Sequence, residues 1–271
     1  MTADPHPAAP EAPHRHWDCG GARPVLALHC SLAHSGAWAG LAARLRGITL
    51  TASDHPGHGR AEDWDGVQDY HRLCTAAATA LARRLAADGR IDLFGHSLGG
   101  TVALRIALEN PGLVRSLVLV EPVLFAAARG SAAFDRLPLF HGDLARMIAE
   151  DRPAAAARFH AEWGAAPALA DLPERQRRYI TDRIHLIPAA NPALVEDNAG
   201  MTRPGGLEGL EMPVLLVEGA ESPAVVGAIH DALAARLPRV ARLVVPGAGH
   251  MVPITHAGAV APAVQAHLDA S

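Results

Sequence analysis

The residues that could do chemistry centre on Ser97, within the Gly-His-Ser-Leu-Gly sequence of residues 95–99. The four residues that precede this five-residue sequence, 91–94, form an apolar run, and residues 98–109 have the pattern of a helix. A strand that turns into a helix so quickly must bend sharply, which forces the central residue into a strained conformation, often with positive φ. The bend would lift the Ser97 hydroxyl beside the free N–H groups of the helix N-terminus, which favour developing negative charge.

Glycines flank this serine at positions 95 and 99. A Cβ atom at either position would collide with the neighbouring strand or helix, so we expect glycine to be required at both. The chain has 25 glycines, and a Gly-x-Ser-x-Gly sequence can therefore arise by chance. Its position between a strand and a helix favours a functional role for Ser97.

Strands that alternate with helices surround this turn. Apolar runs predict strands at 24–28, 48–53, 91–94, 114–120, 213–218 and 241–245. Helical spacing predicts helices at 38–45, 67–85, 98–109 and 223–237, and one near the C-terminus. Fully apolar strands separated by helices are typical of a parallel sheet that is covered on both faces. The sequence thus predicts an α/β fold with a mostly parallel central sheet.

The alternation stops after Glu121. Residues 123–210 are rich in alanine and arginine, have a helical tendency and are punctuated by prolines. Because this stretch is too long for an ordinary connection, we predict a helical cap over the carboxyl edge of the sheet. The cap would interrupt a core made of residues 17–122 and 211–271. Residues 1–16 are rich in Pro, Ala and His and are predicted to form a disordered tail.

The composition is that of an ordinary globular chain, with 271 residues, 49% hydrophobic and 19% charged. The net charge of −4, without a basic block, gives no electrostatic basis for binding nucleic acid or an acidic membrane. The chain shows neither a bilayer-length apolar run nor a secretion signal, so we expect a cytoplasmic protein. Its three cysteines are expected to be reduced thiols.

Four motifs, in this order, resemble those of the α/β-hydrolase fold superfamily. Residues 29–38 are similar to its His-Gly-x loop that ends in Trp, and residues 54–60 to its Asp-x-x-Gly-His-Gly-x signature. Residues 95–100 match its nucleophile turn, and Gly-Ala-Gly-His at 247–250 matches the loop that carries its catalytic histidine. The resemblance extends over nearly everything from Trp17 onward and implies a serine hydrolase with a helical cap.

This resemblance implies that Ser97 is the nucleophile and His250 its base. A serine hydroxyl is a poor nucleophile at neutral pH, and a histidine can take its proton because the imidazole pKa lies near the working pH. The attacked carbonyl becomes an oxyanion, which needs donors aimed at it. The N–H of Leu98 is one expected donor. By family analogy the second is that of Ser31, with Leu32 as the alternative.

The acid of the triad stays open among three glutamates, of which Glu218, at the end of the fifth predicted strand, ranks last. The family usually carries an aspartate in the loop after the fifth predicted strand, but Ser222 stands there and, with Pro223, reads as a helix start. Glu121 ends the fourth predicted strand, where some members carry their acid. Glu221 lies next to the usual position, and its longer side chain could cover the offset. We favour Glu121, then Glu221.

Cys30 stands where the family usually has glycine, and we interpret it as a buried structural thiol. Four histidines, at positions 29, 55, 58 and 96, are expected in loops at the active edge of the sheet. Asp54, His55 and His58 match no usual spacing of metal ligands, so structural hydrogen bonding is expected instead of a metal site.

These features predict a serine hydrolase that cleaves a small to medium carboxylic ester, thioester or lactone through an acyl-enzyme. A serine at position 97 argues against the epoxide hydrolase and haloalkane dehalogenase branches, which need a carboxylate there. No cofactor is implied, and the expected partner is a small-molecule substrate. The alternatives are a C–C hydrolase or lyase on the same fold, or a non-catalytic receptor, which the missing aspartate at 222 would suit. The sequence leaves the substrate and the oligomeric state open.

Overall fold

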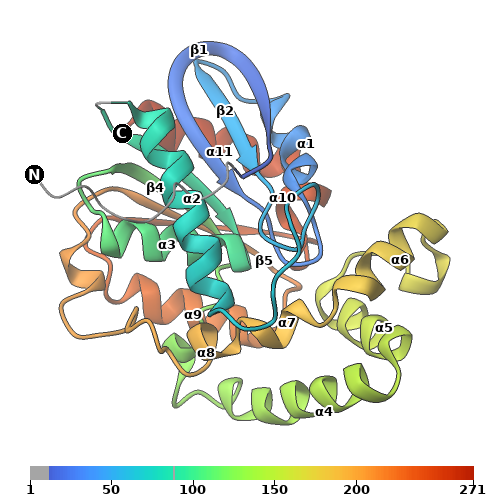
Figure 1. The fold of residues 1–271 in the computed structure, drawn as a ribbon. Coiled ribbons are helices and arrows are strands. Elements are labelled where there is room, and N and C mark those ends of the chain that lie inside the picture. Colours follow the sequence, from blue (N-terminus) through green and yellow to red (C-terminus); the bar gives the residue numbers. More distant parts are fainter. Residues whose placement is uncertain (1–11, 88) are drawn as a thin grey trace, which may run out of the picture.

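The computed structural model describes residues 12–87 and 89–271, which contain a six-stranded sheet in the order β2-β1-β3-β4-β5-β6 (Figure 1). Its strands are β1 His14–Leu28, β2 Ile48–Ser53, β3 Ile91–His96, β4 Val114–Val120, β5 Val214–Gly219 and β6 Val240–Val245. Neighbouring strands from β1 to β6 pair in parallel, and helices cover both faces. The predicted fold class is confirmed.

Each face of the sheet has its own core because alternate strand residues point to opposite faces. Leu93, Leu117 and Leu216 pack in a core with three long helices: α2 Tyr70–Ala86, α3 Leu98–Glu109 and α9 Ala224–Ala234. Their neighbours Phe94 and Val118 pack in a second core with α1 Ala39–Ala42, α10 Val252–Thr255 and α11 Ala257–Asp269. The two cores hold β3 firmly, and the site begins at its end.

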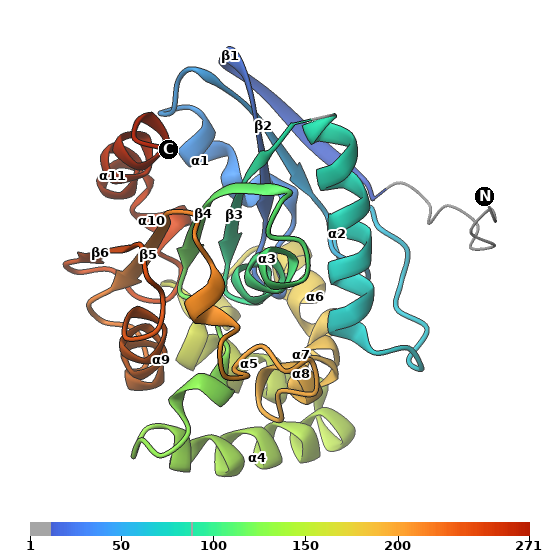
Figure 2. The same cartoon turned by 90° about the vertical axis from the view of Figure 1, so that its left-hand side faces the viewer.

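The insertion between β4 and β5 contains helices and, throughout 123–210, no strand. Its α-helices are α4 Leu137–Glu150, α5 Arg152–Trp163, α6 Glu174–Arg183, α7 Leu186–Ala189 and α8 Asn191–Leu194. Short 3-10 helices occupy Ser35–Trp38, Phe125–Ala128, Phe134–Arg136, Leu169–Asp171 and Leu207–Gly209. Figures 1 and 2 show α4, α5 and α6 together at one end of the sheet. A small apolar cluster that includes Leu144, Ala155 and Ile184 holds them to one another.

The start of the chain differs from the prediction. Residues 1–11 of the predicted tail lie outside the described residues, but His14–His16 belong to β1, so a boundary at Trp17 is wrong. The register runs from His14 opposite Ser53 to Cys19 opposite Ile48 and then reverses after Gly20, whose φ is +78°. The N-terminal half of β1, residues 14–20, has a polar composition that suits an edge segment. Its pairing with β2 gives it an ordered structure that the composition alone did not indicate.

Two helix boundaries also differ. Val67 is 86% exposed and lies before α2, whose first turn is capped by the Asp69 carboxylate, 2.7 Å from the N–H of Arg72. The apolar spacing that included Val67 is therefore a poorer guide than the cap. The predicted helix at 38–45 is replaced by a 3-10 turn and the short α1. None of the helices in the described residues combines the length and apolarity that a bilayer crossing requires.

Candidate active site

Ser97 occupies the sharp turn between β3 and α3. Its φ and ψ are 55° and −117°, a conformation that an L-residue rarely adopts, and this confirms the strain expected from the sequence. The N–H of Ser97 donates to the carbonyl of Val120 at 2.9 Å, which ties the turn to β4. The residue is only 7% exposed, and that exposure faces a cavity.

The two glycines of the motif are required sterically. A Cβ atom on Gly95 would overlap the carbonyl of Gly99 and lie 2.6 Å from the Cα of Gly100. One on Gly99 would overlap the carbonyl of Leu28 and lie 2.6 Å from the carbonyl oxygen of His29. Because every obstacle is backbone, neither clash can be relieved by rotating a side chain.

We therefore expect Gly99→Ala to lower the free energy of unfolding by about 1–3 kcal/mol, as overpacking typically does. Gly112→Ala is the matched control, since Gly112 lies just after α3 and a Cβ atom there meets nothing within 4 Å. Urea unfolding of the two variants measures the difference. Equal midpoints for the two would contradict the steric argument.

His250 lies between β6 and α10 with its ring largely buried. Its Nδ1 lies 2.5 Å from Oε2 of Glu121, and its backbone carbonyl accepts a 2.8 Å hydrogen bond from Nε2 of His96. The indole of Trp163, at the end of α5, stands edge-on to the ring with centroids 4.8 Å apart. Since Nδ1 donates to the carboxylate, Nε2 is left with its lone pair, ready to accept a proton.

Glu121 follows β4 directly and is fully buried. Its Oε1 accepts hydrogen bonds from the N–H of Gly219 at 2.6 Å and the hydroxyl of Ser222 at 2.5 Å. Burial by itself would raise the pKa of Glu121. Hydrogen bonds from His250, Ser222 and Gly219 outweigh the effect of burial and lower the pKa of Glu121 below its ordinary value. The carboxylate is therefore ionised at neutral pH.

Ser222 and Glu221, in the loop after β5, have surroundings that differ from those expected from the sequence. Ser222 does not cap the following helix: α9 begins at Ala224 with Pro223 as its N-cap, and the Ser222 hydroxyl turns to Glu121. The helix-start interpretation of Ser222 is wrong because its hydroxyl donates to a buried carboxylate, and this charge-assisted bond is stronger than the one that it would accept from an N–H of a solvated first turn. Glu221 is exposed, with its N–H bonded to the carbonyl of Ala248. The structure thus brings His250 together with Glu121, not with Glu221.

The structure also distinguishes between the backbone N–H groups that were predicted to bind the oxyanion, those of Leu98, Ser31 and Leu32. Leu98 is the first residue of α3, where the N–H has no partner within the helix. Leu32 has a φ of 61°, and its N–H already donates to Nε2 of His58 at 3.0 Å. Ser31 lines the cavity, and no acceptor for its N–H is found among the described residues. Of the two residues in this loop, Ser31 is the one with a free donor.

The loop histidines hold backbone groups in place. His29 accepts from the N–H of His55 at 3.0 Å, and His55 contacts the carbonyl of His29 at 3.1 Å. Burial, and then neighbouring positive charge, lowers the pKa of His55, His58 and His96 to about 3. Burial raises the pKa of the Cys30 thiol to about 12, which suits a structural role. Within the described residues no group of three or more potential ligands could hold a metal ion.

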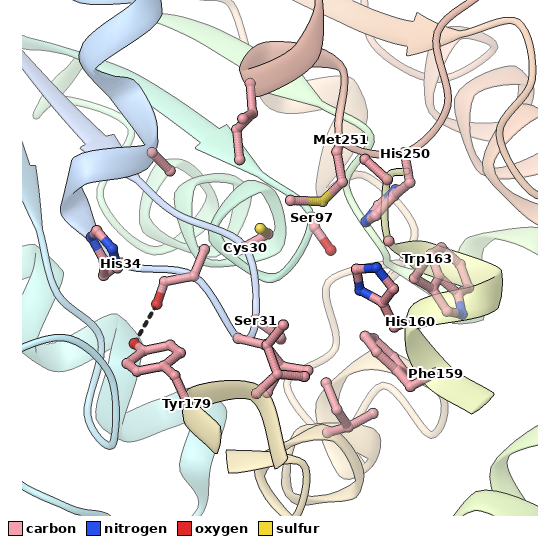
Figure 3. Close-up of a pocket in the computed structure, with 18 of the residues that line it drawn as sticks. Cys30, Ser31, His34, Ser97, Phe159, His160, Trp163, Tyr179, His250 and Met251 are labelled. Atoms are coloured by element: carbon pink, nitrogen blue, oxygen red, sulfur yellow. Dashed lines mark hydrogen bonds between the residues drawn. The ribbon is translucent and has the colours of Figure 1, made fainter. Parts of the chain in front are cut away.

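Ser97 and His250 line one cavity of about 900 Å³. Figure 3 shows both side chains turned into it, with His34 and Tyr179 on one side and Phe159 and Trp163 on the other. The second pair comes from α5 of the insertion, so the cavity is closed partly by the sheet loops and partly by the inserted helices. A bound molecule would lie across Ser97 between these two sides.

A family model described as alpha/beta hydrolase fold matches residues 23–257. The chain belongs to the α/β-hydrolase fold family. The matched residues include the turn at Ser97, at the carboxyl end of β3, and the loop after β6 that carries His250.

Several α/β-hydrolase relatives are similar over part or all of the chain. Lipase LipV of Mycobacterium tuberculosis is 36% identical over 110 residues, 41% of each chain. Monoglyceride lipase of Homo sapiens is 31% identical over 127 residues, 44% of this chain and 42% of its own. The solved structure of a thermophilic esterase has a TM-score of 0.70 at 22% identity, covering 95% of this chain and 97% of that one. The chain thus spans about two fifths of the two lipases, and the esterase likeness shows the fold alone.

Two contacts of this α/β-hydrolase site were missed by sequence reasoning. The hydroxyl of Ser222 bonds Glu121, and the indole of Trp163 packs on His250. A serine in the family's usual acid position was a visible signal for the first. Nothing in the sequence indicated the second, because it depends on how α5 lies over the sheet.

Proposed function

We propose that this protein is a serine hydrolase that cleaves a small to medium carboxylic ester, thioester or lactone through an acyl-enzyme. One observation carries the proposal: the imidazole of His250 has a buried carboxylate on Nδ1 and shares a cavity with the strained Ser97. This is the arrangement that serine nucleophiles need, with a base that a third group holds in one tautomer.

In the first half-reaction the Ser97 Oγ attacks the substrate carbonyl while Nε2 of His250 takes the hydroxyl proton. Glu121 stabilises the imidazolium that forms and does not itself take the proton. The oxyanion accepts from the N–H groups of Leu98 and Ser31. Collapse of the tetrahedral intermediate breaks the bond to the alcohol or thiol, which leaves with the proton from His250. The acyl group then remains on Ser97.

In the second half-reaction a water molecule attacks the acyl-enzyme, and His250 again takes and returns the proton. The carboxylic acid leaves, and Ser97 regains its hydroxyl. The names of the two lipase relatives support ester cleavage by this chain. The aspartate missing at 222, which suited a silent receptor, has a substitute in Glu121, so the enzyme is the better supported of the two.

We also infer that residues 123–210 act as a cap over this site. Phe140, Phe159 and Trp163 of the inserted helices line the same cavity as Ser97. Their rings would shape the pocket for the apolar part of a substrate. The acyl-chain length that the enzyme prefers is accordingly expected to depend on these three residues.

A fluorophosphonate probe tests the proposed function. We expect covalent labelling of the native protein at Ser97, because an activated serine attacks the probe's phosphorus and displaces fluoride to form a phosphonate ester. Peptide mass mapping identifies the labelled residue, and Ser97→Ala should abolish the label and lower ester hydrolysis by at least about 10³-fold. The absence of labelling from pH 6 to 9, with the native protein folded, would favour a ligand-binding receptor instead.

A further inference from the structure

We propose that the substrate carries an anionic group, a carboxylate or a phosphate, which binds to three arginines on one side of the cavity. They are Arg15, Arg60 and Arg175, and we call them the arginine side. This inference rests on the proposed function and deepens it by naming the chemical class of the substrate.

The three arginines come from separate parts of the chain that meet at the loop of residues 33–36. Arg15 belongs to β1, and its Nε lies 3.6 Å from where a Cβ of Gly36 would be. Arg175 lies one helical turn before Tyr179 on α6, which places the two on the same face. The Tyr179 hydroxyl donates to the carbonyl of Ala33 at 2.7 Å, so α6 brings Arg175 to this loop.

Arg60 completes the arginine side from the loop after β2. Its backbone N–H donates to Oδ2 of Asp54, and its guanidinium donates to the carbonyl of His14 at 2.8 Å. The neighbouring Gly59 N–H donates to the Tyr179 hydroxyl at 2.8 Å, which joins this loop to α6 as well. The tertiary structure therefore brings to one cavity three arginines that are 45 or more residues apart in sequence.

The charges of the arginine side are not balanced by nearby acids. Within residues 12–87 and 89–271, none of the three guanidinium groups forms an ion pair with a carboxylate. Asp54 is the one acidic residue among the described residues that line the cavity, and it is 3% exposed. Its Oδ1 accepts from the N–H of Ser35 at 2.7 Å, and its Oδ2 accepts from Arg60, so backbone donors occupy both oxygens. Three arginines against this one carboxylate leave the described cavity lining cationic, in a chain whose net charge is −4.

The other side of the cavity has the aromatic rings of Phe140, Phe159 and Trp163, together with the imidazoles of His141 and His160. Figure 3 shows Ser97 between this side and the side marked by His34 and Tyr179. A substrate bound across Ser97 would therefore have an apolar part toward α5 and an anionic part toward the arginines. The three arginines are solvent-exposed, and guanidinium groups bind carboxylate and phosphate through paired hydrogen bonds.

Matched substrates test this inference. One pair places the charge on the acyl part: the p-nitrophenyl monoester of glutaric acid against p-nitrophenyl pentanoate. A second pair places it on the alcohol part: 4-carboxyphenyl butyrate against 4-carbamoylphenyl butyrate. We expect kcat/KM of the anionic member to be about tenfold or more higher in at least one pair, at low salt. Replacing the carboxylate with a phosphate in that pair shows which anion binds more tightly.

Arginine variants show whether these three residues are responsible. Arg175→Gln and Arg15→Gln should each raise KM for the anionic ester about tenfold, with kcat and the neutral ester little changed, because binding alone is lost. Arg178→Gln is the matched control: this residue is exposed on the same helix but does not line the cavity. Added salt should reproduce the loss in the native protein.

The experiments distinguish a failure of the arginine-side inference from a failure of the proposed function. If the protein hydrolyses neutral esters but neither pair shows a preference for the anion, the inference about the arginine side is wrong and the proposed function stands. The same holds if Arg175→Gln and Arg178→Gln behave alike. If no ester in either pair is hydrolysed and no fluorophosphonate label forms, the proposed function itself is wrong.

Discussion

Glu121→Gln is expected to lower kcat by about 10³- to 10⁴-fold. The amide presents one N–H₂ group, which is a donor, where the carboxylate presents only acceptors. If this group faces His250, Nδ1 must accept, and Nε2 then carries the proton and cannot act as a base. If it faces the other way, it meets the N–H of Gly219 and the Ser222 hydroxyl, and the negative charge that stabilises the imidazolium is still lost. Steady-state kinetics with an uncharged p-nitrophenyl ester measures the effect.

Glu221→Gln is the control for this prediction and should retain nearly native activity, since Glu221 is exposed. A large loss in Glu221→Gln together with a native-like Glu121→Gln would move the assignment of the acid to Glu221.

Exchange of two residues gives a stricter test of the same geometry. Val120 of β4 pairs with Val217 of β5, so the residues that follow these two strands lie at the same corner of the sheet. The carboxylate of Glu121 already touches the Ser222 hydroxyl there. We expect the double variant Glu121→Ser with Ser222→Asp to recover about 10- to 100-fold over Glu121→Ser alone, as a carboxylate returns to reach of His250. No recovery in a folded double variant would show that position 222 cannot present an acid to His250.

A steep loss of stability in mild acid is the second large effect. Among the almost completely buried imidazoles are five whose pKa is lowered the furthest, with burial as the first cause: to about 3 for four of them, and well below 6.5 for His29. The five are His29, His55, His58, His71 and His96. Above about pH 6.5 both the folded and the unfolded chain keep these rings neutral, and their contribution to stability is undiminished. Between pH 6.5 and 3 the unfolded chain binds protons that the folded chain does not. The free energy of unfolding therefore decreases as the pH is lowered.

The size of this effect follows from the same linkage. At pH 5 each ring favours the unfolded chain by roughly 2 kcal/mol. Five rings together are comparable with the whole stability of an ordinary domain, about 5–15 kcal/mol. The lowered pKa of Glu121 acts in the same direction, because its contribution is present above the ordinary carboxyl pKa and is lost as pH falls below it. We expect acid unfolding between about pH 6 and 4.

Urea unfolding at a series of pH values measures the slope of the free energy against pH. His71→Gln should reduce that slope between pH 6 and 4 by about one proton, or 1.4 kcal/mol per pH unit, and leave it unchanged above pH 7. This residue lies on α2 against the Thr101 hydroxyl, away from the proposed catalytic groups. A flat stability profile from pH 7 to 4.5 would show that these rings are protonated in the folded protein.

The sequence by itself determined the features that depend on neighbouring residues. The turn at Ser97 follows from an apolar strand, a helix and two glycines within a few positions, because local sterics leave the backbone little choice. The alternation of apolar runs with helical spacing likewise determined the parallel sheet and the inserted helices, since burial on both faces requires that pattern. Sequence reasoning did not predict the edge half of β1 because this segment becomes ordered only by pairing with β2.

Only the tertiary structure decided which groups meet at the site. Glu121 and Glu221 both fall between Ser97 and His250 in the chain, and their separation in sequence does not say which side chain enters the buried corner beside Gly219. The free N–H of Ser31, against the occupied one of Leu32, depends on His58 from another loop. The arginine side gathers residues from β1, the loop after β2 and α6. These contacts join segments far apart in the chain, and strand pairing and helix packing, which no local pattern encodes, bring them within reach.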